Sequence, residues 1–524
     1  MTWDAIVIGS GFGGAMAAHA LVHAGHRVLM LERGGWVGRG PDSWGPRGAG
    51  LITPHYAMDS AYDVSAGGRQ YKAGSWNCVG GQSVFYGGAS YRFRESDFQH
   101  HDEIVGTSAA EWPFGYGDVE PFYSEAELLL GVAGESGRDR TEPARSVAYP
   151  QAAAPLAHSA QRIADAASRL GLTPSRIPLA ISYAANAGGT RSGCIKCGSC
   201  DGYACAAEAK NDLASAVIPG LVRLGMTLRT NTVCVRLVRT GSRVTEVECV
   251  NRVTGQRERI SADRVILGAG TLATPHLLLA SNLAVVNPAA GAVGRYLTRH
   301  RNAVVFGVYA RRPNPTREFD KQVAIFDFYR TAGCIQQMTP PEGLVRAYLP
   351  RIVRTPAAMV LSRASGLLVI AEDQPNADNG VSIDWSRTDR YGLPRLRIRH
   401  RYSDRDERAA TELIVQAKRV LRETGARLTF VNPIETFSHA LGTVRMGLDA
   451  RTAPLDEHGR FRGLDNVYVV DGSALPRSAS VNPSLTIAAN ALRVGAHIAR
   501  AAAPTHARSR RKGRMRRNLP VLNP

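Results

Sequence analysis

The chain has 524 residues, of which 44% are hydrophobic and 21% charged, a balance typical of a soluble globular protein. This length favours two to four domains or one large interleaved architecture over a single small core. The formal net charge of +19 is partly local, because the stretch THARSRRKGRMRRN at 505–518 holds seven Arg and Lys and no acid. We interpret residues 501–524 as a disordered, solubilising tail in preference to a nucleic-acid or membrane-binding one, so no nucleic-acid partner is predicted.

Targeting signals are not evident. The apolar run at residues 5–8 ends at Gly9 without a preceding basic flank, which argues against a signal peptide. No uninterrupted apolar run reaches the length of a membrane span. The eight cysteines do not form a secreted disulfide framework, because four of them lie in CIKCGSCDGYAC at 194–205. We therefore expect a cytoplasmic protein.

The first motif is a nucleotide-binding turn. Residues 4–8 (DAIVI) predict a buried strand, and the following GSGFGG places Gly9, Gly11 and Gly14 in the G-x-G-x-x-G register. A helical segment and a second strand, RVLMLE, lead to Glu32. In such a unit the glycines allow a tight turn, close approach of a pyrophosphate and helix–strand packing, while the acid binds the ribose. Glu32 favours FAD or NAD over NADP, whose extra phosphate it would repel.

The remaining elements suggest that the nucleotide sheet is revisited late in the chain. A predicted helix at 209–225 precedes two strands that are expected to form a hairpin, and strand–turn–helix patterns recur at 264–281 and 466–499. Between them, residues 301–400 alternate apolar and polar positions and predict a separate, largely antiparallel sheet. Further helices are expected near 158–170 and at about 404–425.

Five ordered blocks together carry a family resemblance. They are GSGFGG with Glu32, VGGQSVFYGG (79–88), GAGTLATPHLLLAS (268–281), HALGTVRMG (439–447) and VVDGSALPRSASVNPSLTIAANA (469–491). In these blocks the chain resembles the glucose–methanol–choline (GMC) flavoprotein oxidoreductases, over nearly its whole length to about residue 500. The resemblance implies an α/β fold in which a Rossmann-like FAD-binding domain carries an inserted substrate domain built on an antiparallel sheet.

The same resemblance implies domain boundaries and site residues. The FAD-binding domain would comprise 1–93, 185–300 and 435–500, and the substrate-binding domain 94–184 and 301–434. His439 matches the catalytic histidine of the family, and Asn482 its second active-site position, in the branch that has Asn there. The implied cofactor-binding residues beyond the first motif are Gly80, Gly81, Ser83, Tyr86, Gly87, Cys234, Gly270, Asp471, Gly472 and Pro483.

The chemistry implied is FAD-dependent oxidation of an alcohol to a carbonyl by hydride transfer to flavin N5. A neutral imidazole at His439 suits the base that removes the hydroxyl proton, and the Asn482 amide would hold the substrate oxygen. His300 could lie near the flavin or serve a structural role. The electron acceptor could be dioxygen, a quinone or a protein.

The substrate is expected to be a hydroxyl-rich small molecule such as a sugar, glycoside or aminocyclitol. Four polar residues of the predicted second sheet could recognise hydroxyls: Asp327, Tyr329, Gln336 and Gln337. The aromatic content of 7% argues against the larger apolar lining that a sterol needs. The alternatives are oxidation of a sterol or other hydrophobic alcohol, and non-redox lyase chemistry on the same flavin fold.

The cysteine stretch raises a separate question. Cys194, Cys197, Cys200 and Cys205 have the spacing C-x₂-C-x₂-C-x₄-C, which departs from the bacterial ferredoxin pattern. We favour a compact loop of buried thiols, with a disulfide as one option, over an iron–sulfur cluster, and so predict no metal site. The cysteines and the basic tail together leave an electron-transfer or nucleic-acid scaffold as a rival of another class.

Overall fold

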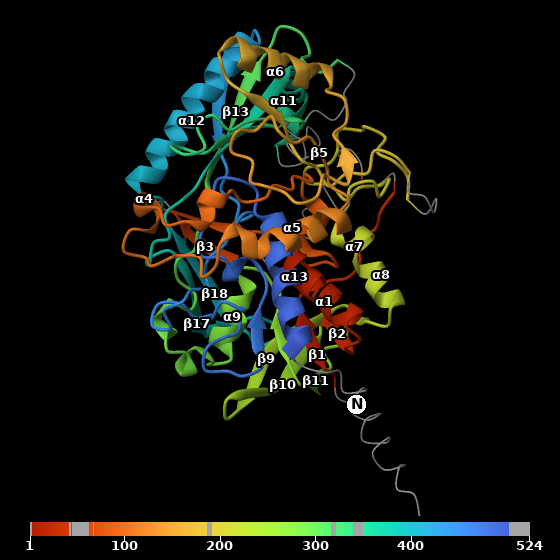
Figure 1. Cartoon of the computed structure of the whole chain (residues 1–524), viewed down its shortest axis with the longest axis vertical. Helices are drawn as coiled ribbons and strands as arrows, with labels where there is room; N and C mark the ends of the chain where they lie inside the picture. Colours follow the sequence, from red (N-terminus) through yellow and green to blue (C-terminus); the bar gives the residue numbers. More distant parts are fainter. Residues whose placement is uncertain are drawn as a thin grey trace, which may run out of the picture.

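The computed structural model of the chain describes residues 3–40, 43, 62–66, 68–185, 191–315, 321–338 and 349–501 (Figure 1). The predicted basic tail beyond Ala501 lies outside these residues. Among the helices so described, none combines the length and the apolarity needed to cross a bilayer.

A five-stranded parallel sheet forms the nucleotide-binding half of the molecule. Its strand order is β20-β12-β1-β2-β8, with every neighbouring pair parallel. The strands are β1 (Ala5–Ile8), β2 (Val28–Leu31), β8 (Thr227–Arg229), β12 (Val265–Leu267) and β20 (Val467–Val469). The apolar runs AIVI, VLML and VIL are wholly buried, as strands covered on both faces require. The sheet thus joins three stretches that are far apart in the sequence, as predicted.

Helices α1 (Phe12–His23) and α13 (Ser484–Ala501) pack side by side against this sheet, with α5 (Tyr116–Leu129) beside α13 (Figure 1). Their contact is close because it is made by small residues. A Cβ at Gly495 would lie 2.9 Å from Ala20 Cβ. The C-terminal block is therefore docked directly on the helix that follows the first glycine turn.

A six-stranded antiparallel sheet forms the other end of the molecule and confirms the expected second sheet (Figure 1). In spatial order its strands are β19 (Leu428–Pro433), β13 (Arg301–Val308), β16 (Ala364–Ala371), β15 (Cys334–Met338), β14 (Val323–Ile325) and β7 (Pro174–Arg176). Alternate residues such as Val305 and Val369 pack under the predicted helices α6 (His158–Arg169) and α12 (Asp404–Glu423). Their neighbours point to the opposite face, toward the first sheet.

Three smaller sheets complete the described fold. The predicted hairpin is β9 (Thr232–Thr240) and β10 (Arg243–Asn251), extended by β11 (Arg257–Ser261). A four-stranded sheet has the order β17 (Gly380–Thr388), β18 (Pro394–His400), β3 (Tyr62–Ala66) and β4 (Arg69–Ala73). The third pairs β5 (Ala133–Gly134) with β6 (Gln151–Ala152). The four-stranded sheet links segments predicted to lie in different domains, and the domain boundaries stay a prediction.

Two sequence expectations need correction. The helix predicted at 209–225 is two short helices, α7 (Leu213–Ala216) and α8 (Ile218–Arg223), because Pro219 opens a new helix and disfavours helical backbone before it. Within the stretch 301–400 that was predicted to alternate as strands, residues 322–330 contribute only the short strand β14, since the chain turns after Phe326. The remaining elements are α4 (Asp102–Val105), α9 (Ala273–Ala280) and α11 (Arg354–Leu361), with 3₁₀ helices at Gly81–Phe85, Glu95–Phe98, Ala284–Val286, Ala290–Ala292, Arg351–Val353 and Gly472–Ala474.

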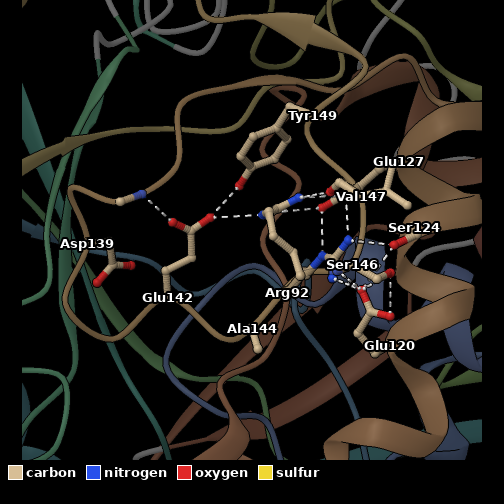
Figure 2. A network of polar contacts seen from close by, with 12 residues as sticks. Arg92, Glu120, Ser124, Glu127, Asp139, Glu142, Ala144, Ser146, Val147 and Tyr149 are labelled. Carbon is tan, nitrogen blue, oxygen red and sulfur yellow. Dashed lines mark hydrogen bonds and ion pairs between the residues drawn. The ribbon is translucent and has the colours of Figure 1, made fainter.

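A buried ionic network fastens α5 to the loop that follows it (Figure 2). Arg92, with a side chain 1% exposed, donates to Glu127 over 2.7 and 2.9 Å and to Glu120 over 2.8 Å. Glu127 also accepts from Arg145 over 3.0 Å, and the Arg145 guanidinium lies 3.7 Å from the Tyr149 ring centre. Arg92 thus balances the charge of Glu120 and shares the buried Glu127 carboxylate with Arg145.

We expect Arg92→Met to lower the free energy of unfolding by about 3–5 kcal/mol, because the buried Glu127 carboxylate would lose both hydrogen bonds from Arg92 and keep only Arg145. The measurement is urea denaturation at neutral pH. The control is Arg138→Met, which removes an exposed pair with Glu135 and should cost less than about 1 kcal/mol. Equal losses in the two variants would contradict the assignment of Arg92 as the central cation.

Candidate active site

One large cavity lies between the carboxyl ends of the parallel strands and the six-stranded sheet. Its volume is about 830 Å³, within the range of cofactor and ligand sites. It brings together most of the predicted site residues: Gly9, Gly11, Glu32, Gly81, Tyr86, Gly87, Cys234, Gly270, His439, Asp471, Gly472, Asn482 and Pro483. Three others, Gly14, Gly80 and Ser83, lie behind the lining.

The glycines of the first motif have distinct tasks. A Cβ at Gly9 would lie 2.4 Å from the Gly268 carbonyl oxygen, and one at Gly14 would lie 1.9 Å from the Gly9 carbonyl oxygen. A Cβ at Gly11 would meet no atom within 4 Å, since this residue faces the cavity at the start of α1. Two glycines are thus required by packing, while the third keeps a helix N-terminus open to an anion.

Glu32 closes one end of the cavity. Its carboxylate is buried and accepts hydrogen bonds from Ser10 N (3.1 Å), Ser10 Oγ (2.5 Å) and Gly34 N (2.9 Å). Burial raises the pKa of Glu32, and these hydrogen bonds oppose that rise. Cys234 lines the same cavity and is the cross-strand partner of Cys249, with 3.7 Å between the two sulfurs. This end has the acid and the open backbone that a nucleotide requires.

The glycine-rich loop 79–88 is held from behind. Ser83 Oγ donates to the Gly80 carbonyl over 2.6 Å and accepts from Leu213 N over 3.1 Å. Tyr86 donates from its hydroxyl to the Asn211 carbonyl over 2.8 Å. Ser83 and Gly80 therefore support the loop, whereas Tyr86 also reaches the cavity wall.

Asp471 couples two strand ends. Its buried carboxylate accepts from Ser473 N (2.9 Å), Ser473 Oγ (2.6 Å), Gly270 N (2.9 Å) and Thr274 Oγ1 (2.5 Å). Burial raises the pKa of Asp471, while the four donors favour its charged form. The carboxylate therefore fixes the glycine turns that follow β12 and β20, so that both face the cavity.

His439 and Asn482 meet at the opposite end, under the six-stranded sheet. Asn482 Nδ2 lies 3.3 Å from His439 Nε2, and Asn482 Oδ1 is buried without a hydrogen-bond partner among the described residues. Burial holds the pKa of His439 well below its ordinary value, with smaller contributions from His300 and Lys321. A neutral imidazole and an amide side chain thus line one cavity, an arrangement suited to proton abstraction from a bound hydroxyl.

Three residues complete this end of the site. His300, for which the sequence left open a place near the flavin or a structural role, has its Nδ1 2.9 Å from His439 Nδ1. Asp201 and Lys321 were not predicted; they form an ion pair of 2.9 Å in the cavity wall. A Cβ at Gly87 would lie 1.8 Å from Asp201 Oδ1, so the pair sits directly against the glycine-rich loop.

The four predicted substrate-contacting residues do not line the cavity, and that prediction is wrong. Asp327 is exposed and accepts from Thr173 N over 3.0 Å. Tyr329 donates to the buried Asp97 over 2.7 Å. Gln336 and Gln337 are buried inside the sheet region and are absent from the cavity wall. The strand positions that face the cavity are apolar or amide-bearing, and include Asn302, Met338 and Leu368.

The four clustered cysteines line a separate cavity of only about 10 Å³. All are free thiols, and Lys196 N donates to Cys194 Sγ over 3.4 Å. Cys200 is buried but Cys197 is exposed, so the expectation of four buried thiols is wrong. Within the described part of the chain, no group of three or more His, Cys, Asp or Glu is arranged to hold a metal ion.

Lys210 connects this cysteine loop to the main cavity. Its fully buried ammonium donates to the carbonyl oxygens of Tyr86 (2.7 Å), Cys200 (2.9 Å) and Tyr203 (2.7 Å). Burial lowers the pKa of Lys210. The three carbonyls satisfy every donor of the ammonium and hold the loop so that Asp201 reaches the cavity wall.

Comparison with known proteins agrees with this geometry. Two family models described as GMC oxidoreductase match residues 4–302 and 375–491. Paromamine 6'-oxidase of Streptomyces fradiae is 31% identical over 521 residues, which cover 95% of this chain and 91% of that protein. 6'''-Hydroxyparomomycin C oxidase of Streptomyces lividus is 31% identical, again covering 95% and 91%.

Two more distant matches extend the comparison. 2-Methyl-1,2-propanediol dehydrogenase of Mycolicibacterium austroafricanum is 27% identical over 95% of both chains. The crystal structure of pyridoxine 4-oxidase from Mesorbium loti has a TM-score of 0.65 at 20% identity, covering 95% of this chain and 99% of that one. The structural likeness supports the fold, and the matched families imply a flavin cofactor.

The glycine geometry makes a paired prediction. We expect Gly11→Ala to keep the thermal stability of the protein near wild type but to lower its flavin content at least tenfold, because the added methyl group enters the cavity. Gly14→Ala should instead lower stability, because its Cβ collides with the backbone of the turn. Thermal unfolding and the flavin absorbance of the purified variants report the two effects. Full flavin content in a stable Gly11→Ala protein would contradict the assignment of this turn to the cofactor.

Proposed function

The chain belongs to the GMC oxidoreductase family, and from this premise we propose that it oxidises a hydroxyl group of an amine-bearing, hydroxyl-rich small molecule to a carbonyl with FAD as cofactor. The observation that carries the proposal is the single cavity that contains both Glu32 with the glycine turn and the His439–Asn482 pair. A cavity of about 830 Å³ that is lined by both Glu32 and His439 supports a full dinucleotide over a shorter flavin.

The residues of the cavity suit this cofactor. Glu32 and Cys234 would contact the adenosine end, and the open backbone at Gly11 would receive the pyrophosphate. Gly472 and Pro483 would lie beside the rest of the flavin nucleotide. When bound, the flavin accepts the hydride from the substrate carbon.

The protein supplies the base and the orientation. A substrate hydroxyl inserted between His439 and Asn482 would donate its proton to Nε2 and accept a hydrogen bond from the Asn482 amide nitrogen. Both groups lie at the end of the cavity under the six-stranded sheet, so they would hold the reacting carbon in one orientation.

Substrate class is inferred from the polar groups near the base. Asp201 and Glu435 offer acceptors for hydroxyl and ammonium groups, and Lys321 offers a donor. The two relatives named as oxidases of paromamine and of 6'''-hydroxyparomomycin C act on aminated sugars by their names. We therefore propose an aminoglycoside or aminocyclitol glycoside as the substrate. Dioxygen, a quinone or a protein would then reoxidise the flavin.

The first functional prediction concerns the base. His439→Ala should bind flavin normally but reduce it with substrate about 10²–10⁴-fold more slowly, the usual contribution of a general base. Anaerobic stopped-flow bleaching of the flavin measures this rate. His458→Ala, which removes an exposed histidine stacked on His497, is the control and should match wild type. Bleaching at the wild-type rate in His439→Ala would refute the role, and turnover without any bleaching would indicate lyase chemistry.

The second functional prediction concerns the pH dependence of flavin reduction. Because the pKa of His439 lies well below 6.5, the base stays neutral as the pH falls through that value. The rate of flavin reduction should therefore remain flat down to pH 6 and decline only in more acidic buffer. The groups that face the ring are Asn482, His300 and Lys321, of which Lys321 carries the charge that opposes protonation. A half-maximal rate at pH 6.5 or above would contradict this picture.

The third functional prediction concerns the selectivity for aminated over non-aminated substrates. Asp201→Asn should raise the KM for aminated sugars by roughly 10–100-fold, the loss expected for one charged hydrogen bond, and should affect non-aminated analogues less. Steady-state kinetics with matched pairs of aminated and hydroxylated substrates measures the difference. Glu457→Gln, an exposed acid outside the cavity, is the control. An equal effect on both substrate types would assign Asp201 to holding Lys321 instead.

A further inference from the structure

The imidazole rings of His300 and His439 meet in an unusual way. Their Nδ1 atoms are 2.9 Å apart and the rings are nearly perpendicular, at 85°. His300 is 1% exposed and does not line the cavity, so it has no direct access to a substrate. A contact of this length between two ring nitrogens requires one proton between them, and the partners of the other nitrogens decide where that proton resides.

The partner of His300 Nε2 determines which nitrogen of His300 carries the proton. It lies 2.9 Å from the carbonyl oxygen of Ser478, which can only accept a hydrogen bond. The proton of a neutral His300 must therefore be on Nε2, and its Nδ1 carries a bare lone pair. His439 must then donate through its own Nδ1–H, which leaves the lone pair of its Nε2 facing Asn482 Nδ2 at 3.3 Å.

We propose that His300 is a positioning residue that selects the tautomer of His439, keeping Nδ1 protonated and Nε2 free as the base. This inference rests on the proposed function only in giving His439 the role of base. The tautomer itself follows from the contacts of the resting protein. An unconstrained His439 would distribute its proton over both nitrogens, and the form with Nε2–H could not accept a proton from the substrate.

The backbone at His300 is built to hold this orientation. His300 has φ +62°, in the left-handed region that is unfavourable for a residue with a side chain. Asp373 fixes this conformation, because its Oδ1 accepts from His300 N over 2.9 Å and its Oδ2 from Arg299 N over 2.8 Å. Tyr402 donates to the His300 carbonyl over 2.8 Å. Strain of this kind is retained where the surroundings over-determine a functional geometry.

The charges around the pair keep His300 neutral. Burial lowers the pKa of His300, and the nearby carboxylates of Asp373 and Glu372 oppose that effect. Both carboxylates are already engaged: Glu372 with Arg477 at 3.0 Å, and Asp373 with His400 at 3.4 Å and Ser478 Oγ at 3.0 Å. A protonated His300 would donate from both nitrogens, which would force the His439 proton onto Nε2 and abolish the base.

The same contacts determine the fate of the abstracted proton. When Nε2 of His439 takes the hydroxyl proton, the ring becomes an imidazolium that still donates from Nδ1 to His300. His300 cannot pass a proton onward, because its Nε2–H already faces the Ser478 carbonyl, which is not a base. The proton therefore stays on His439 and leaves by the cavity side.

The direct test is ¹⁵N NMR of the histidine-labelled flavoprotein at neutral pH, with the His439 signals assigned by comparison with His439→Gln. We expect a protonated Nδ1 and an unprotonated Nε2 in the wild type. In His300→Ala the proton should shift toward Nε2. A wild-type His439 with its proton on Nε2 would overturn the proposal, whatever the substrate proves to be.

Kinetics supply the second test and a matched pair of variants. His300→Asn keeps an oxygen acceptor near the position of Nδ1 and should retain flavin reduction within about tenfold, whereas His300→Ala should lose about 100-fold or more. His300→Ala combined with His439→Ala should be no slower than His439→Ala alone, because the first residue acts through the second. Equal losses in the Asn and Ala variants, or losses that multiply in the double variant, would overturn the proposal. A fast His439→Ala enzyme would instead refute the proposed function and leave the NMR result standing.

Discussion

The close contact of glycine turns at the carboxyl ends of three parallel strands is the constraint on which the site depends. A Cβ at Gly268 would lie 2.6 Å from Gly14 N, and one at Gly13 would lie 2.4 Å from the Val470 carbonyl oxygen. These turns follow β1, β12 and β20, which are hundreds of residues apart in the sequence. Because backbone touches backbone there, the three strand ends can only meet with glycine, and their meeting creates the floor of the cavity.

Charged groups around the floor are satisfied mainly by fixed backbone dipoles. Asp471 and Asp373 each accept backbone amides, and Lys210 donates to three carbonyls. Such contacts are costly to rearrange in a buried environment, since any displaced group would lose its hydrogen bonds without gaining water. The polar residues therefore act as a rigid frame that orients backbone around the His439 and Asn482 side chains of the cavity wall.

In the cysteine-rich stretch at 194–205, the side chain that reaches the main cavity is that of an aspartate and not of a cysteine. Its thiols surround a very small space, whereas its aspartate, Asp201, reaches the main cavity and pairs with Lys321. Lys210 is the link, because it binds a carbonyl of the loop and a carbonyl of the flavin-site loop at once. A segment first considered for its cysteines thus contributes an aspartate to the wall of the main cavity.

Local sequence was sufficient for the features whose chemistry depends on neighbouring residues. The strand–turn–helix around Gly9, the amphipathic helix at 404–423 and the second sheet were all predicted, because periodicity and turn chemistry act over a few residues. The resemblance to known motifs supplied His439 and Asn482, which meet as expected. The prediction of one helix at 209–225 failed because a proline starts a new helix there. The four proposed substrate residues failed because Asp327 is exposed, Tyr329 binds Asp97, and Gln336 and Gln337 contact Cys334 and Ser159 inside the protein.

The sequence by itself determined the glycine turns and the apolar strands, and the resemblance of its motifs pointed to the histidine that we propose as the base, since each of these is written in a contiguous stretch. Tertiary structure alone decided which distant groups surround that base. The contact of His300 with His439, the pair of Asp201 with Lys321 and the carboxylate of Asp373 all join residues that are tens to hundreds of positions apart. Such contacts form only when the two sheets pack over one another. The tautomer of a histidine depends on these contacts, because the position of its proton is set by neighbouring atoms in space and not by neighbours along the chain.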